Sequence, residues 1–451
     1  MRLRSSLSLP QAATLLHGDL IHGGASVIRS AAVDTRSMDP DGLFFALPGS
    51  HADGSLYLEE AGRAGAVCAV VNRKWKERAV SSSLPCILVD DPLSSLWAFS
   101  HAQAAPYGKV RYVGVTGSCG KTTTKDAIAA ILSKQGKTVK TPGNLNSEIG
   151  LPLSVLQVGA DTEYGVFEMG VDHEAEMSHM LSVVKPEVSV LTNIGISHLE
   201  KFGNQEAIAH EKGQIFHRDV HAGFIASGSP FIRQIEREQH ILLRQYGPEE
   251  LYAIDRGLAG YDILLSGRLV PVHAVGRHML TDIAGAIQVA RFMGVDEEVI
   301  AEGLEHFTPL EGRGTVLGGD VTIIEDCYNA SLDSTNSMLD YMAHLSWNGK
   351  KKVALGTMKE LGSESVYAHE MVAEKILRSG ISGTFLYGNE MKTAFDVLKR
   401  NRYEGLLSFT DDFEELKEKV TGSVEKGDLF LLKGSRSMAM ERLIPAIRNV
   451  G

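Results

Sequence analysis

The sequence predicts an α/β protein of three domains, two of which contain a parallel sheet covered by helices. With 451 residues, the chain is longer than one hydrophobic core normally allows. Short β-branched runs alternate with longer runs of helical periodicity, which is the pattern of parallel sheets. A break at Ala105–Gly108 and a second regular alternation from about Thr308 divide the chain into domains 1–107, 108–307 and 308–451.

Composition and charge favour a cytoplasmic protein that acts on small molecules. Hydrophobic residues make up 43% of the chain and charged residues 22%, as in ordinary soluble proteins. The net charge of −11, without a long Lys/Arg run, argues against nucleic-acid binding. Four scattered cysteines predict reduced thiols. The N-terminus lacks the apolar core of a signal peptide, and no segment is apolar for long enough to insert into a membrane.

The first 107 residues predict a small α/β domain built from short elements. We expect strands at Ala31–Asp34, 42–48, Ala66–Val71 and Cys86–Val89. We expect helices at Leu9–Gly18, Leu56–Gly65 and from Pro92 to about Ala104.

A glycine-rich turn at the start of the second domain predicts a phosphate-binding site. Val110–Thr116 has the pattern of a buried strand, and Lys121–Gln135 that of a helix with one apolar face. Gly117 and Gly120 lie in the turn between them. Glycines here allow backbone N–H groups to surround phosphate oxygens, beside the positive end of the helix. The segment therefore predicts a nucleotide-binding P-loop on a parallel sheet.

Three further side chains would complete such a site. Lys121 can reach the terminal phosphates, and the Thr122 hydroxyl can bind Mg²⁺. The strand Tyr164–Phe167 delivers Glu168 to the carboxyl edge of the sheet, where it can hold Mg²⁺ directly or through water. The glycine spacing is shorter than in the usual P-loop, because Val115 stands where the first glycine is common.

Two more segments lead to the same edge of the predicted sheet. The strand Glu187–Leu191 is followed by Thr192. The loop Thr141–Pro152 contains Asn144 and Asn146, which either contact a ligand or serve turn formation, since Asn favours loops in any case.

The last portion predicts a second, Rossmann-like doubly wound sheet, because strands and helices alternate regularly. We expect strands at Val321–Glu325, Lys352–Leu355, Gly383–Tyr387 and Asp428–Leu432. We expect helices at Ser334–Leu345, Tyr367–Ser379, Met391–Asn401, Phe413–Ser423 and Ser437–Arg448.

Several motifs together resemble the Mur ligase family of ATP-dependent amide-forming enzymes. In the middle of the chain these are TGSCGKTTTK, TPGNLNSEIGLP, FEMG, TNIGISHLEKFG and AHEKGQIF. Further along, LEGRG, IIEDCYNASLDST, LGTMKELGSES and LLKGSRSMAMERL are similar to the member that adds D-alanyl-D-alanine to UDP-N-acetylmuramoyl-tripeptide. The resemblance covers all three predicted domains and implies a cytoplasmic, monomeric enzyme of peptidoglycan synthesis that uses ATP and Mg²⁺.

The resemblance also implies a role for individual residues. The catalytic set is Lys121, His198 and Lys212. One Mg²⁺ would be bound by Thr122 and Glu168 and a second by His198 and Lys212, the lysine carrying a CO₂-derived carbamate that makes it an anionic oxygen ligand. Nucleotide binding would involve Gly117, Ser118, Cys119, Gly120, Lys121, Thr122, Thr123, Asn144, Asp282, Arg313 and Asp326. Substrate binding would involve Asp34, Thr35, Arg36, Asn146, Thr192, Asn329, Ser334, Lys433, Ser435 and Arg436.

Two segments depart from the family pattern. Met279 and Asp282 stand where relatives have asparagines, the second of which contacts adenine. An ionised aspartate only accepts hydrogen bonds, so either other groups hold the base or Asp282 lies at a helix start on a solvated face. In the uridine-nucleotide segment 33–54, Asp41 and Gly42 replace the usual Gly-Asp, and Ser55 stands where histidine is common.

Two alternatives to this ligase remain open. One is a sister ligase or a folylpolyglutamate-synthase-like enzyme with another amino substrate, although no D-N-P-R-like segment is present in the last domain. The other is a non-catalytic nucleotide-binding relative, suggested by Met279 and Asp282. In the cluster of Lys433 and Arg436, the two cations suit a dipeptide carboxylate, and the alternative is a loop with solvated charges.

Overall fold

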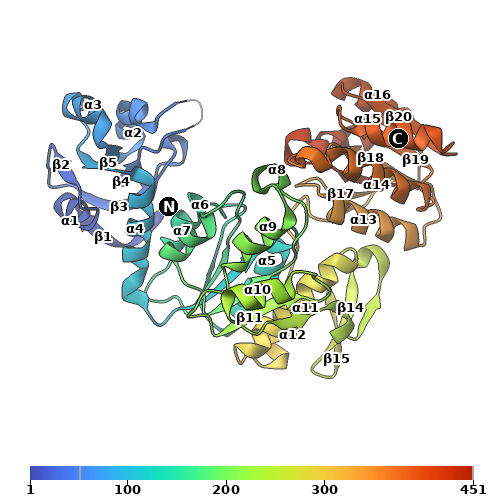
Figure 1. Cartoon of the computed structure of the whole chain (residues 1–451), viewed down its shortest axis with the longest axis horizontal. Coiled ribbons are helices and arrows are strands. Elements are labelled where there is room, and N and C mark those ends of the chain that lie inside the picture. Colours follow the sequence, from blue (N-terminus) through green and yellow to red (C-terminus); the bar gives the residue numbers. More distant parts are fainter. Residues whose placement is uncertain (50–51, 449–451) are drawn as a thin grey trace.

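The structure is a computed structural model that describes residues 1–49 and 52–448. Figure 1 shows an elongated molecule with the N-terminal part in blue, the central part in cyan to yellow and the C-terminal part in orange and red at the opposite end. Three large sheets follow one another along the chain. The α/β class and the three-part architecture are therefore confirmed, whereas the boundaries at 107/108 and 307/308 stay predictions.

The N-terminal sheet has six strands in the order β1-β3-β4-β5-β6-β2, with β1 and β2 antiparallel at its two edges. Its strands are β1 Arg2–Ser8, β2 Asp19–Ile21, β3 Val27–Ala32, β4 Gly42–Phe45, β5 Ala66–Asn72 and β6 Cys86–Val89. Its helices are α1 Leu9–Leu15, α2 Leu58–Ala64, α3 Lys76–Ser81 and α4 Pro92–Ala104. The strand predicted at Ala31–Asp34 lies earlier in the chain, as β3, and the two edge strands were not predicted from the sequence.

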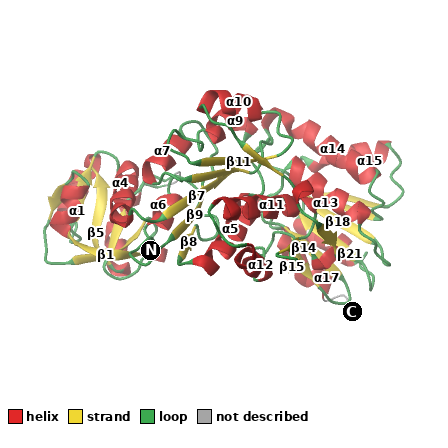
Figure 2. Ribbon diagram, turned by 90° about the horizontal axis from the view of Figure 1, so that it is seen from below, coloured by secondary structure: helices red, strands yellow, loops and turns green. Residues whose placement is uncertain are grey.

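The central sheet is parallel throughout, in the order β12-β11-β10-β7-β9-β8. Its strands are β7 Arg111–Thr116, β8 Thr138–Lys140, β9 Tyr164–Glu168, β10 Val188–Leu191, β11 Ala222–Ala226 and β12 Arg244–Tyr246. Figure 2 shows α9 Gln205–Gly213 and α10 Ile232–Gln239 on one side of these strands, and α5 Lys121–Gln135, α11 Arg277–Phe292 and α12 Glu297–Glu305 on the other. The remaining helices are α6 Gly150–Val155, α7 Glu176–Val183 and α8 Leu199–Phe202.

Helix α5, which begins at the end of the P-loop, is held in place by its buried apolar face. Ile128, Ile131 and Leu132 are fully buried, at the spacing that places them on one side of a helix. They belong to the core that α5 shares with α11 and α12. A small antiparallel sheet of β13 Ala253–Asp255, β14 Tyr261–Leu265 and β15 Arg268–Val272 extends this core. The rigid packing of α5 sets the position of the P-loop.

The C-terminal sheet has the order β16-β17-β21-β18-β19-β20 and is parallel except for β16. Its strands are β16 Thr315–Leu317, β17 Thr322–Asp326, β18 Lys351–Gly356, β19 Gly383–Tyr387, β20 Leu406–Thr410 and β21 Leu429–Lys433. Its helices are α13 Leu332–His344, α14 Ser365–Leu377, α15 Met391–Arg400, α16 Phe413–Thr421 and α17 Ile444–Arg448.

The helix expected at Ser437–Arg448 is wrong in its first half. Short 3₁₀ turns occupy Arg436–Met438 and Met440–Leu443, and α17 begins only at Ile444. Ala439 between the turns has a left-handed backbone with φ 48°, which interrupts a right-handed helix. Among the helices of residues 1–49 and 52–448, none has the length and apolar character needed to cross a bilayer.

Candidate functional site

A cavity of about 380 Å³ lies between the central and C-terminal sheets. Its central wall is formed by the P-loop, Glu168, His198 and the start of α11. Its C-terminal wall contains Arg313, Asp326, Asn329, Ser334 and Lys433. The remaining predicted residues that line it are Ser118, Cys119, Gly120, Lys121, Thr122, Thr123, Asn144, Asn146 and Asp282. The cavity thus joins sequence motifs from two separate sheets.

The P-loop backbone needs its two glycines for different reasons. Gly117 has φ 145° and Gly120 has φ 81°, both in the left-handed range that favours glycine. A side chain at Gly117 would collide with the Thr192 hydroxyl, and one at Gly120 would collide with the Asp282 carboxyl. Gly120 precedes the first residue of α5 without a side-chain cap, so the N–H groups of the first helical turn are left for a ligand.

Lys121 bends back over the loop that it follows. Its Nζ donates hydrogen bonds to the backbone oxygens of Gly117 at 2.8 Å and Ser118 at 3.2 Å. Burial lowers the pKa of its ammonium, and Glu168 opposes this shift. An anionic phosphate group in the loop would give this cation a stronger partner than two neutral carbonyls.

The residues predicted to hold the first Mg²⁺ lie together. Glu168 is 1% exposed at the end of β9 and accepts hydrogen bonds from Thr122 Oγ1 at 2.8 Å and from Asn146 Nδ2 at 2.6 Å. A buried carboxylate beside a hydroxyl is a donor set that suits Mg²⁺. Asn146 therefore orients Glu168 here, whereas we predicted that it contacts the substrate.

The second predicted metal pair occupies two sides of the same region. His198 is partly exposed at the start of α8, with a left-handed φ of 62°, and lines the cavity. Lys212 is 1% exposed on α9, and its Nζ donates to the Val171 carbonyl at 3.3 Å. Burial, and after it the charge of Lys121, lowers the pKa of Lys212 to about 7. A lysine that is partly neutral near pH 7 can react with CO₂, so this environment suits a carbamate.

Asp282 is not on a solvated face. It is 7% exposed, lies on Gly120 and shares the cavity with Met279 and His278. Burial raises the pKa of its carboxyl well above the usual range. A protonated carboxyl both donates and accepts hydrogen bonds, as an asparagine amide does, whereas an ionised aspartate only accepts them.

The C-terminal wall is held by its own contacts. Lys433 Nζ forms an ion pair with Asp326 at 2.6 Å and donates to the Asn329 carbonyl at 3.1 Å. The Arg313 guanidinium stacks 4.1 Å from the Tyr328 ring centre. One direct contact crosses to the P-loop, where Cys119 Sγ lies 2.9 Å from the Ser331 hydroxyl. Ser331 also caps helix α13.

Several predicted substrate residues do not line this cavity. Thr192 donates its hydroxyl to the Cys119 carbonyl and so supports the P-loop from behind. Ser435 accepts from the Lys359 N–H at 2.9 Å, and exposed Arg436 pairs with Glu441 at 2.6 Å. In the predicted cation cluster of this loop, only Lys433 reaches the cavity.

The predicted uridine-nucleotide residues belong to the N-terminal sheet. Asp34 caps the 3₁₀ turn Thr35–Ser37, and the Arg36 guanidinium folds back onto its carboxylate. This hydrogen bond lowers the pKa of Asp34 to about 2. The Thr35 hydroxyl donates to Glu60 at 2.5 Å. These residues form a polar surface of their own.

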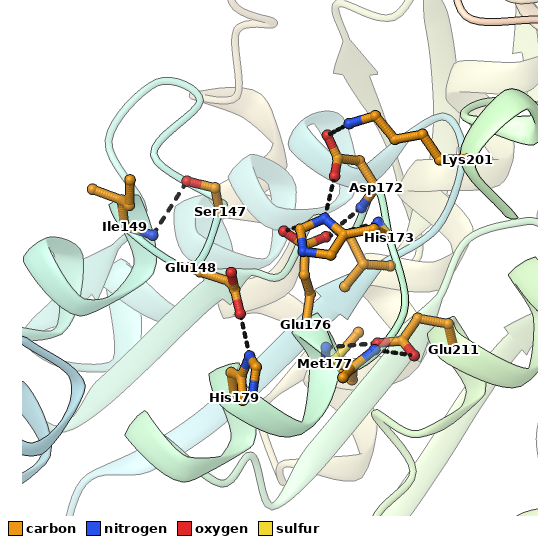
Figure 3. A network of polar contacts seen from close by, with 12 residues as sticks. Ser147, Glu148, Ile149, Asp172, His173, Glu176, Met177, His179, Lys201 and Glu211 are labelled. Atoms are coloured by element: carbon orange, nitrogen blue, oxygen red, sulfur yellow. Dashed lines mark hydrogen bonds and ion pairs between the residues drawn. The ribbon is translucent and has the colours of Figure 1, made fainter. Parts of the chain in front are cut away.

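Sequence reasoning missed a polar network at the edge of the cavity (Figure 3). Glu176 accepts hydrogen bonds from the backbone N–H groups of Asp172 at 2.5 Å and His173 at 3.1 Å. Glu148 pairs with His179, and His173 Nδ1 lies 2.7 Å from Asp172. The signal was available as the acidic run DHEAE at 172–176, which contains one histidine and begins four residues after Glu168, the end of β9.

Comparison with known families places this site in context. Residues 115–290 match the Mur ligase middle domain, and residues 312–436 match the family described as Mur ligase, glutamate ligase domain. The UDP-N-acetylmuramoyl-tripeptide–D-alanyl-D-alanine ligase of Treponema pallidum is 33% identical over 437 residues, which cover 94% of this chain and 95% of that protein. The Bacillus subtilis ligase of the same name is 31% identical over 433 residues, with 93% of each chain covered.

Solved structures agree with the sequence relatives. MurF from Acinetobacter baumannii has the same fold, with a TM-score of 0.88 at 23% identity over 99% of this chain and 100% of that one. The MurF ligase of Thermotoga maritima in complex with ADP has a TM-score of 0.79 at 27% identity, covering 94% of this chain and 97% of that one.

Proposed function

The chain belongs to the Mur ligase family, and on that basis we propose that it joins D-alanyl-D-alanine to UDP-N-acetylmuramoyl-tripeptide with ATP as the energy source. The products are the UDP-linked pentapeptide, ADP and phosphate. The observation that carries this proposal is the position of the P-loop. The P-loop and Glu168 lie on the central wall of the cavity, and Lys433 lies on its C-terminal wall.

The first step transfers the γ-phosphoryl group of ATP to the terminal carboxylate of the tripeptide. The N–H groups that follow Gly120 and the Lys121 ammonium bind the phosphates. The carboxylate oxygen attacks the γ-phosphorus, the bond to ADP breaks, and an acyl phosphate forms. The protein supplies orientation and positive charge, and no side chain acts as a nucleophile.

Two divalent cations fit the donor groups of the central domain, of which Lys212 lies outside the set of residues that line the cavity. Thr122 and Glu168 would hold one, and His198 with a carbamate on Lys212 would hold the other. Bound Mg²⁺ supplies charge neutralisation for the phosphoryl group. In its absence Asn146 and Thr122 keep Glu168 oriented.

The second step forms the amide bond. The free amine of the dipeptide attacks the acyl carbon, inorganic phosphate leaves, and the amine gives up its proton. Asn329, Ser334 and Lys433 lie on the opposite wall from the P-loop, where they suit the dipeptide. Closure of the two walls excludes water, which matters because acyl phosphates hydrolyse readily.

The N-terminal sheet carries the rest of the substrate in this proposal. Asp34, Thr35 and Arg36 would contact the uridine nucleotide, and Arg36 would exchange its internal pair with Asp34 for a ligand contact. Because the substrate is a nucleotide-linked precursor, we place the reaction in the cytoplasm. We also propose, from the family resemblance alone, that the enzyme is a monomer.

The decisive test measures phosphate release from ATP and Mg²⁺ with UDP-N-acetylmuramoyl-tripeptide, with and without D-alanyl-D-alanine. Release that requires the dipeptide, with the pentapeptide mass as product, supports the proposal. Release with another amino acid or with a folate substrate would assign a sister ligase or a folylpolyglutamate-synthase-like enzyme. Bound nucleotide without release for any amine would assign a non-catalytic relative. The Lys121→Ala variant should lose turnover.

A further inference from the structure

One carboxylate at the interface between the central and C-terminal domains has no part in the steps above. Glu360 lies in the loop after β18, and its Oε2 is 2.6 Å from His198 Nδ1. The two residues come from different domains of the predicted division. Glu360 lies outside the set of residues that line the cavity, and its carboxylate approaches His198 from the C-terminal side.

The contact between His198 and Glu360 has the length of an ion pair. Within residues 1–49 and 52–448, no hydrogen-bond partner is found for His198 Nδ1, which is shielded from solvent although Glu360 Oε2 lies 2.6 Å away. A ring nitrogen without a hydrogen bond in the described part of the chain therefore faces a carboxylate oxygen.

Backbone conformation marks both residues as unusual. His198 has φ 62° and Glu360 has φ 65°, left-handed values that are uncommon for residues with a side chain. Such strained conformations persist only where the surroundings enforce them, and they cluster at functional sites. Two strained residues from two domains therefore direct their side chains to the same point.

The loop that carries Glu360 is held firmly in this position. The Lys359 N–H donates to Ser435 Oγ at 2.9 Å, and the Lys359 side chain pairs with Glu390 at 2.7 Å. On the other side, the turn at Gly362 packs against α8, so that an added Cβ would lie 3.1 Å from Glu200 Cα. The loop thus reaches the helix that follows His198.

We propose that Glu360 supplies an oxygen ligand to the divalent cation that His198 helps to bind, so that this cation ties the C-terminal domain to the central one. The inference rests on the proposed function, because that function requires the second cation. Neighbouring ligands of an octahedral ion with bonds of about 2.1 Å lie about 3 Å apart, close to the separation found here. The cation would lie between the ring nitrogen of His198 and the carboxylate of Glu360, which converge here from two domains.

The test uses Mn²⁺ as the probe, with the full chain and a non-hydrolysable ATP analogue. Bound Mn²⁺ is counted by electron paramagnetic resonance in wild type, in Glu360→Gln and in the control Glu364→Gln, which changes a carboxylate of the same loop. We expect two ions in wild type and in the control. In Glu360→Gln we expect one ion to bind about 10-fold or more weakly, because loss even of a group that only orients a metal ligand costs about 10-fold or more in affinity.

A competing interpretation predicts the opposite sign. If Glu360 merely pairs with His198, its removal frees the histidine, and Mn²⁺ binding in Glu360→Gln is unchanged or tighter; that result overturns the proposal. A second readout is the radius of gyration from small-angle X-ray scattering. Mn²⁺ and the nucleotide analogue should compact wild type and the control more than Glu360→Gln, and equal compaction would also overturn it.

Failure of the proposed function remains distinguishable from failure of this inference. Two Mn²⁺ ions with the expected Glu360 dependence, but no dipeptide-dependent phosphate release, would support the cation ligand and reject the ligase. Dipeptide-dependent release with a single Mn²⁺ ion in wild type would support the ligase and reject Glu360 as a ligand. Matching melting temperatures of the three proteins establish that the variants are folded.

Discussion

At the scale of single residues, Lys212 has the environment with the clearest consequence. Its pKa of about 7 means that the amine becomes neutral, and able to react with CO₂, as the pH rises through 7. We expect Lys212→Ala to lose nearly all ligase activity, and short carboxylic acids such as formate to restore part of it by filling the vacated place. Phosphate release at pH 6 to 8, with and without bicarbonate, measures this. The control Lys212→Arg keeps the positive charge, and carboxylic acids should not restore its activity. Full activity of Lys212→Ala without added carboxylic acid would refute the carbamate.

Asp282 gives a second residue-level prediction, for stability. Because its folded-state pKa is raised, the native protein holds a proton that the unfolded chain releases, and stability falls as pH rises from the ordinary carboxyl pKa toward the raised one. One pKa unit corresponds to about 1.4 kcal/mol. Asp282→Asn is neutral at every pH, so the difference in unfolding free energy between variant and wild type should grow in the variant's favour between pH 5 and 8. Urea unfolding at several pH values tests this prediction. A difference in unfolding free energy that stays constant between pH 5 and 8 would contradict a buried neutral carboxyl at Asp282.

At the scale of elements, the P-loop and α5 depend on Gly120, and replacing it with alanine has two effects that can be measured separately. Gly120→Ala introduces both a left-handed alanine and a collision with Asp282. Gly228→Ala introduces nearly the same φ, 83°, into open space. We expect the control to lose about 1 kcal/mol and to bind ATP normally, and Gly120→Ala to lose ATP binding as well. Calorimetric titration with ATP compares them, and equal affinities would mean that the loop tolerates a side chain.

The elements that sequence patterns predicted are those whose pattern is set by burial. Helix α5 has the predicted bounds because its apolar spacing matches its buried face. Strand β20 at Leu406–Thr410 was missed because it is an edge strand, with Leu406 50% exposed, and so lacks a continuous apolar run. The interrupted helix before α17 was missed because a single left-handed residue, Ala439, leaves little trace in periodicity.

At the scale of the whole molecule, the limit of sequence reasoning lies at the interface between domains. The P-loop side of the cavity follows from one strand–turn–helix motif, so its residues could be predicted together. The Cys119–Ser331 contact joins positions separated by 212 residues, and the His198–Glu360 contact depends on how two sheets pack. Ser435 and Arg436 show the reverse error, since proximity in sequence to Lys433 did not bring them to the cavity. Motifs indicate chemistry, whereas domain packing decides which side chains meet.

That packing can itself be tested with one substitution. Cys119 Sγ lies 2.9 Å from the Ser331 hydroxyl, so Ser331→Cys would place two thiols within reach of a disulfide between the P-loop and the C-terminal domain. We expect mild oxidant to form this bond, to abolish ATP turnover, and a reductant to restore it. Free-thiol titration and non-reducing peptide mapping measure the bond. Cys68, Cys86 and Cys327 are buried and should stay reduced, and Cys119→Ser combined with Ser331→Cys is the matched control. Failure to cross-link in the folded variant would mean that the domains rarely adopt this arrangement in solution.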